Sequence, residues 1–140
     1  MDKILAVETR RKEPESEKIT INLGYVDLGH IDLLVQEGFY SNRTDFIRTA
    51  IRNQLSSHGD VLKQTVARRS MVLGLQRYTR EDLERVRKAG EQLHIQVLGL
   101  ALIDDDVPPR LAAQTIASIA VLGALRASPA VRAALSDRIR

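Results

Sequence analysis

The first half of the chain has two different spacings of hydrophobic residues, one typical of a strand and one typical of helices. Residues 18–23 alternate strictly between polar and apolar, which is the period of a half-buried strand. From Val26 the apolar positions follow a helical period, and Gly38 is a suitable stop for that helix. Asn42, followed three residues later by Asp45, predicts the N-cap of a second helix that ends near residues 58–59.

The second half continues with its own strands and helices. The pattern predicts a short helix over residues 60–68, a buried strand over 70–75 and a helix over 79–91 that opens on the N-cap pair of Thr79 and Asp82. The next strand, residues 93–103, is apolar on both faces, as the centre of a parallel sheet is. A strand-helix-strand unit of this kind predicts a right-handed parallel crossover.

Beyond this unit the chain is broken by two prolines and then becomes apolar again. After Pro108-Pro109 we expect a buried helix over residues 109–126, and Ser128-Pro129 predicts the start of a last helix. We identify no internal repeat. The predicted fold class is α+β, with an N-terminal β-α-α module and a small C-terminal α/β domain of order β-α-β-α-α. The predicted boundaries are a flexible arm at 1–17, the module at 18–58, a linker or short helix at 59–69 and the C-terminal domain at 70–140.

Composition and charge narrow the class of protein. The chain has 140 residues, 44% hydrophobic and 28% charged, which is typical of a globular protein. It contains no cysteine, which excludes disulfides and thiolate metal sites. Residues 1–12 lack the apolar core of a signal peptide, and the apolar run 116–125 is too short to span a bilayer. These features predict a soluble cytoplasmic protein, and the net charge of +3 permits an anionic partner.

The single N-terminal strand predicts a dimer, because one short strand leaves an unpaired sheet edge. Antiparallel pairing with the same strand of a second copy forms a two-stranded ribbon, which fits the major groove of B-DNA. Its polar side chains, Lys18, Thr20 and Asn22, then face outward to read bases. The predicted dimer core combines the inward side of the ribbon with apolar residues of the two helices: Ile19, Ile21, Leu23, Ile31, Leu34, Phe46, Ile47 and Ile51. The start of the second helix, with its free backbone N–H groups and Arg43, predicts a phosphate anchor.

These residues resemble the ribbon-helix-helix superfamily (Arc/MetJ/CopG type). The resemblance covers Lys18 to about Ser57 and depends on KITINL at the strand and GFYSNRTDFIRTAIR at the turn and second helix. It implies an obligate dimer that reads bases with the ribbon, while four residues at the turn hold DNA phosphates: Ser41, Asn42, Arg43 and Thr44. The chain departs from the family at Gly24-Tyr25, where many relatives carry proline or serine.

The second half offers no catalytic or metal-binding motif. The carboxylates of Asp104–Asp106 suit a hard cation, but a loop before two prolines explains them as well, and His94 has no nearby ligand partner in the sequence. We therefore predict no metal, no cofactor and no enzymatic activity. The predicted helix within 111–125 carries small residues that favour close packing against a copy of itself, which predicts a second association surface and allows a tetramer.

The sequence favours a transcription regulator, more specifically a repressor, that binds double-stranded DNA. An antitoxin of a toxin-antitoxin pair and an architectural or partition DNA-binding protein are the alternatives. Antitoxins usually join this module to a polar tail that folds on the toxin, whereas residues 70–140 are patterned as a folded domain.

Overall fold

The computed structural model describes residues 16–140, so most of the predicted arm lies outside the described residues. The chain divides into two compact units, one up to Gly59 and one from Asp60 to Arg140. Each unit is described by itself.

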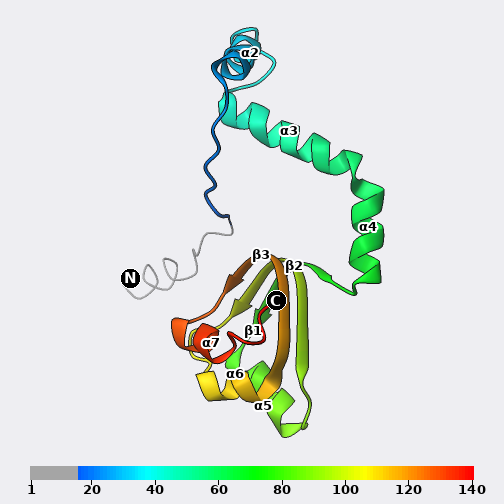
Figure 1. The fold of residues 1–140 in the computed structure, drawn as a ribbon, viewed down its shortest axis with the longest axis vertical. Coiled ribbons are helices and arrows are strands. Elements are labelled where there is room, and N and C mark those ends of the chain that lie inside the picture. The colour runs from blue at the N-terminus through cyan, green and yellow to red at the C-terminus, as the bar shows by residue number, and fades with distance from the viewer. Residues whose placement is uncertain (1–15) are drawn as a thin grey trace, which may run out of the picture. The chain divides into compact units, whose positions relative to one another are not determined.

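The first unit contains the two predicted helices. They are α2 (Tyr25–Gln36) and α3 (Arg43–Ser57), and both lie where the hydrophobic pattern places them (Figure 1). Gly38 ends the first helix as predicted: its φ of +85° is left-handed, and Phe39 N–H then donates to the Leu34 carbonyl at 3.0 Å. Residues 17–24, ahead of α2, form neither helix nor strand in the single chain.

The second unit is built on a three-stranded parallel sheet with the order β1-β2-β3 (Figure 1). A helix α4 (Gly59–Arg68) leads into it. The elements that follow are β1 (Val72–Tyr78), α5 (Arg80–Lys88), β2 (Leu93–Ile103), α6 (Pro109–Thr115), β3 (Ile116–Arg126) and α7 (Pro129–Ala134). The predicted parallel pairing across the strand-helix-strand unit is confirmed by the register Val72↔Val97 through Tyr78↔Ile103.

The predicted helix over residues 109–126 is wrong in its second part. The helix α6 ends at Thr115, and residues 116–126 form the strand β3, so the order is β-α-β-α-β-α and the sheet has three strands. A continuous apolar run has the same appearance in a buried helix and in a buried strand. The β-branched residues Ile116, Ile119 and Val121 favour the strand, since they lose rotamer freedom in a helix and fit a pleated sheet.

One face of the sheet holds the core. Successive side chains of a strand point to opposite faces, and in β2 the buried residues are Ile95, Val97, Ala101 and Ile103. They pack in one cluster with residues of the helices and loops, namely Leu83, Val107, Leu111, Ala112, Val131 and Leu135. The helices therefore cover the face to which these β2 side chains point. The chain moves across the sheet in one direction, and connections of one hand then place all the helices on that same face.

The three strands carry a repeated motif that the sequence analysis missed. Val-Leu-Gly occurs at 72–74, 97–99 and 121–123, and the three copies are 25 and 24 residues apart. The register aligns them side by side, with Gly74 paired to Gly99 and Gly99 paired to Gly123. The second unit is thus a series of strand-helix repeats, each of which buries its apolar face against its neighbours.

The aligned glycines have a structural reason. Gly74, Gly99 and Gly123 have φ values of +111°, +139° and +119°, a region that side-chain-bearing residues rarely adopt. A Cβ built at Gly99 would lie 2.2 Å from the Gly74 carbonyl oxygen, and one at Gly123 would lie 2.1 Å from the Gly99 oxygen. Only glycine therefore fits at positions 99 and 123 of this row.

Candidate nucleic-acid interface

The segment ahead of α2 presents the predicted ribbon residues to solvent. All of residues 16–24 are exposed, including Lys18, Thr20 and Asn22. The alternating apolar residues are exposed too: Ile19 is 72% exposed, Ile21 58% and Leu23 38%. Apolar side chains at every second position of this segment thus keep exposed surface in the single chain, where residues 17–24 pair with no strand of the sheet. Pairing into a two-stranded ribbon remains a prediction.

The helices α2 and α3 bury few of their apolar side chains in the single chain. Ile31 is 6% exposed, while Leu34, Phe46 and Ile47 are half-buried and Ile51 remains 46% exposed. The rings of Tyr40 and Phe46 pack edge to face, with their centroids 5.0 Å apart. The predicted dimer-core residues other than Ile31 thus have apolar surface available for a second copy.

The first turn of α3 is capped as the sequence predicts. The Asp45 N–H donates to the Asn42 side-chain oxygen at 2.8 Å, and the Ser41 N–H donates to the Asp45 carboxylate at 2.9 Å. These bonds fix the turn that carries Ser41, Asn42, Arg43 and Thr44, all of which are exposed. The structure brings these four predicted phosphate contacts together at the positive end of a 15-residue helix.

Arg43 is engaged in an ion pair that the sequence analysis did not predict. Its guanidinium donates two hydrogen bonds to the Asp32 carboxylate, both 2.8 Å long, which connect α3 to α2. The hydrogen bond from Arg43 holds the pKa of Asp32 below its ordinary value, and the positive charge of Arg43 acts in the same direction. Asp32 lies 11 residues before Arg43 and off the apolar stripe, so no pattern in the sequence marks it.

An exposed ion pair of this kind is weak, because water and salt screen it. A DNA phosphate can therefore compete with Asp32 for the same guanidinium. If the α3 turn binds phosphate as predicted, Asp32 limits how strongly it does so.

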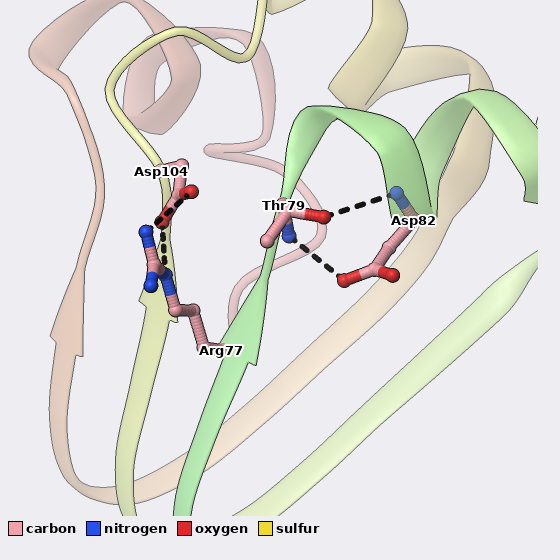
Figure 2. Close-up of polar contacts among 4 residues, drawn as sticks. All are labelled: Arg77, Thr79, Asp82 and Asp104. Atoms are coloured by element: carbon pink, nitrogen blue, oxygen red, sulfur yellow. Dashed lines mark hydrogen bonds and ion pairs between the residues drawn. The ribbon is translucent and has the colours of Figure 1, made fainter.

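Polar contacts in the second unit have structural roles. Arg77, at the end of β1, donates to the Asp104 carboxylate at 2.8 and 2.9 Å and so ties β1 to the segment after β2 (Figure 2). Thr79 and Asp82 form the predicted capping box of α5, with both reciprocal hydrogen bonds 3.1 Å long (Figure 2). The first carboxylate of the Asp104–Asp106 run is thus already paired with an arginine.

Residues 16–140 contain no group of three or more histidine, cysteine or acidic side chains placed to hold a metal ion. None of the helices in that range is both long and apolar enough to cross a membrane.

A family comparison identifies the class of protein to which this fold and this site belong. Residues 14–132 match the model of the ribbon-helix-helix transcriptional regulator family, so the match spans most of the chain and both units. The chain therefore belongs to that family, whose members are DNA-binding transcription regulators that usually dimerise and are generally not enzymes. No curated protein and no solved structure matches the chain.

Proposed function

We propose that this protein is a sequence-specific repressor that binds operator DNA as a dimer. The observation that supports this most directly is the alternation of polar and apolar residues over 18–23, in a segment whose side chains are all exposed in the single chain. The three apolar side chains there are 72%, 58% and 38% exposed in the single chain, and the three polar ones that alternate with them carry hydrogen-bond donors and acceptors. Antiparallel pairing of two such segments buries the apolar set against the helices and presents the polar set to the DNA.

Recognition then divides between two groups of residues. Lys18, Thr20 and Asn22 from both chains enter the major groove, where donors and acceptors distinguish all four base pairs. The α3 turn, from Ser41 to Thr44, holds the phosphates on either side and fixes the position of the ribbon, with no sequence preference of its own. A repressor of this kind acts by occupying a site that transcription requires.

The test is the selection of bound fragments from a random DNA pool, with the parent compared with Thr20→Ala/Asn22→Ala. The parent should enrich a short palindromic or repeated site, and the double variant should lose that preference while it remains dimeric. Each lost base contact should reduce discrimination by about 1–3 kcal/mol at its base pair. Ser16→Ala/Glu17→Ala serves as the control in the same extended segment and should enrich the same site as the parent.

Two outcomes would reject the proposal. If the parent binds DNA without enriching any sequence, the protein has an architectural or partition role. If it binds no DNA at all, an antitoxin-like role in protein binding becomes the better explanation. Repression itself is checked with a reporter gene that carries the selected site in its promoter, where expression should fall when the parent is present.

A further inference from the structure

The face of the sheet opposite the helices is largely leucine. Its side chains are those that alternate with the buried residues of β1, β2 and β3: Leu73, Leu75, Leu98, Leu100, Leu102 and Leu122. We call this surface the leucine face. Leu73 is 72% exposed, Leu75 50% and Leu122 48%, and the three leucines of β2 are half-buried between them.

The leucine face is bare within the second unit because of the topology. All the helices that follow a strand lie on the other side of the sheet, so residues 69–140 supply no second layer. Parallel sheets in proteins are almost always covered on both faces. A contiguous apolar surface on a soluble protein usually marks an interaction site.

The polar residues on this side of the sheet lie at its two ends. His94, Gln96 and Ser118 lie towards the start of β2 and β3, where a hydrogen bond of 2.9 Å joins His94 Nδ1 and Ser118 Oγ. Arg77 and Arg126 lie at the ends of β1 and β3. The centre has no charged side chain. This arrangement of an apolar centre and a polar rim is the anatomy of a protein-protein interface, and it gives no attraction to DNA or to a charged peptide.

We infer that the leucine face binds the leucine face of a second copy of this chain, so that two sheets pack into a sandwich. An uncharged surface of aliphatic residues is complementary to itself. Packed sheets lie roughly 10 Å apart with interdigitated side chains, and leucine is suited to that spacing. The sequence predicted self-association through a helix over residues 111–125, most of which is the strand β3 in the structure, and we assign this role to the open face of the sheet instead.

The size of the face explains why the partner is a second copy. Three strands about 4.8 Å apart and roughly 23 Å long give a flat area of only about 300 Å², well below the roughly 800 Å² per partner of a stable interface. Such a contact needs a partner that is already held nearby. The ribbon dimer of the proposed function supplies one, because linking two chains at one site raises the effective concentration at another.

The experiment uses the full chain. Because the chain contains no cysteine, an introduced cysteine is its single thiol, and any cross-link must form at that position. Leu98→Cys puts the thiol in the central strand, and Arg87→Cys puts it on the exposed surface of α5 as the matched control. A short bismaleimide should cross-link two copies of the Leu98→Cys variant and should leave the Arg87→Cys variant as single chains. Adding Leu73→Glu/Leu122→Glu to Leu98→Cys should remove the cross-linked band, because four carboxylates would be buried in the contact.

Three results would overturn the inference. The first is equal cross-linking at positions 98 and 87, and the second is cross-linking that survives the two glutamates. The third is a thiol at position 98 that is neither cross-linked nor accessible to a monofunctional maleimide, since another part of the same chain would then cover the face. Circular dichroism of each variant confirms that the sheet is intact. DNA selection with Leu73→Glu/Leu122→Glu separates this inference from the proposed function, because the ribbon should still select the parental site.

Discussion

Single glycines in the sheet have unequal importance, although all three belong to the same motif. Gly99→Ala places a methyl group against the backbone carbonyl of Gly74, which cannot turn aside as a flexible side chain could. The strands must then move apart, so we expect the free energy of unfolding to fall by roughly 3 kcal/mol or more, from backbone strain and overpacking together. Gly74→Ala has the same unfavourable φ sign but open space around the new Cβ. Gly74→Ala should therefore lower the free energy of unfolding by the backbone strain alone, about 1–3 kcal/mol.

Urea denaturation of the two variants checks this order. The Gly74 variant is the matched control, because it changes the same residue type in the same row at the sheet edge. Equal destabilisation by both alanines would mean that the close approach of the strands at Gly99 contributes nothing beyond its φ.

Substitutions at Asp32 and at Arg43, the two partners of one ion pair, should change DNA affinity in opposite directions. Arg43→Ala removes a phosphate contact, so affinity for every sequence should fall, and the slope of log K against log salt should flatten by about 1. Asp32→Asn removes the competing charge and should raise affinity severalfold with a steeper slope. The pKa of Asp32 is below its ordinary value of 3.8, so the competing carboxylate is ionised throughout the neutral range.

Salt titrations by fluorescence anisotropy measure both slopes. Arg48→Ala, an exposed arginine farther along α3, is the control for a simple loss of charge. If Asp32→Asn and Arg43→Ala shift the slope in the same direction, the two residues do not compete for phosphate.

At the level of elements, α5 depends on its capping box for its first turn. Thr79→Ala removes the acceptor of the Asp82 N–H and should lower the free energy of unfolding by about 1 kcal/mol. Hydrogen bonds from Thr79 lower the pKa of Asp82 below its ordinary value of 3.8. The ionised carboxylate therefore stabilises the folded helix at neutral pH, and this contribution is lost as the pH falls through 3.8 and below.

Thermal unfolding followed from neutral to acidic pH tests both statements. Between neutral and acidic pH, the parent should lose more stability than the Asp82→Asn variant. When Thr79→Ala is added to both proteins, the difference between their losses should become smaller. Ser128→Ala, which removes the equivalent cap of α7, is the control because that cap has no carboxylate to titrate.

The elements that the sequence predicts well are those with local signals. Caps at Asn42, Thr79 and Ser128 and the stop at Gly38 depend on neighbouring residues, so α2, α3, α5 and the start of α7 are found where they were expected. The strand β3 was mistaken for a helix because its signal is not local: it pairs along β2, 24 residues earlier in the repeat. The Val-Leu-Gly motif is the pattern in the sequence that would have identified it. For the Arg43–Asp32 pair no such pattern exists, because the geometry of the turn between two helices decides it.

The two units differ in how completely each closes its own core. Among the described residues of the first unit only the side chain of Ile31 is a buried hydrophobic, whereas the second unit has a cluster of twelve buried residues. A unit with so little buried surface is not stable alone. The folding of residues 18–57 should therefore be linked to dimerisation and depend on protein concentration, while the core of residues 72–135 does not need a partner.

Hydrogen exchange at two protein concentrations tests this difference between the units. On dilution below the dissociation constant of the dimer, amides of α2 and α3 should lose protection, while those of β2 keep theirs. The selected DNA site should restore protection in α2 and α3, because a ligand that binds only the folded dimer stabilises it by mass action. An unrelated fragment of equal length is the control. Loss of protection in both units at the same concentration would show that the two units fold together. Dimerisation and DNA binding would then not control the folding of residues 18–57 separately from the rest of the chain.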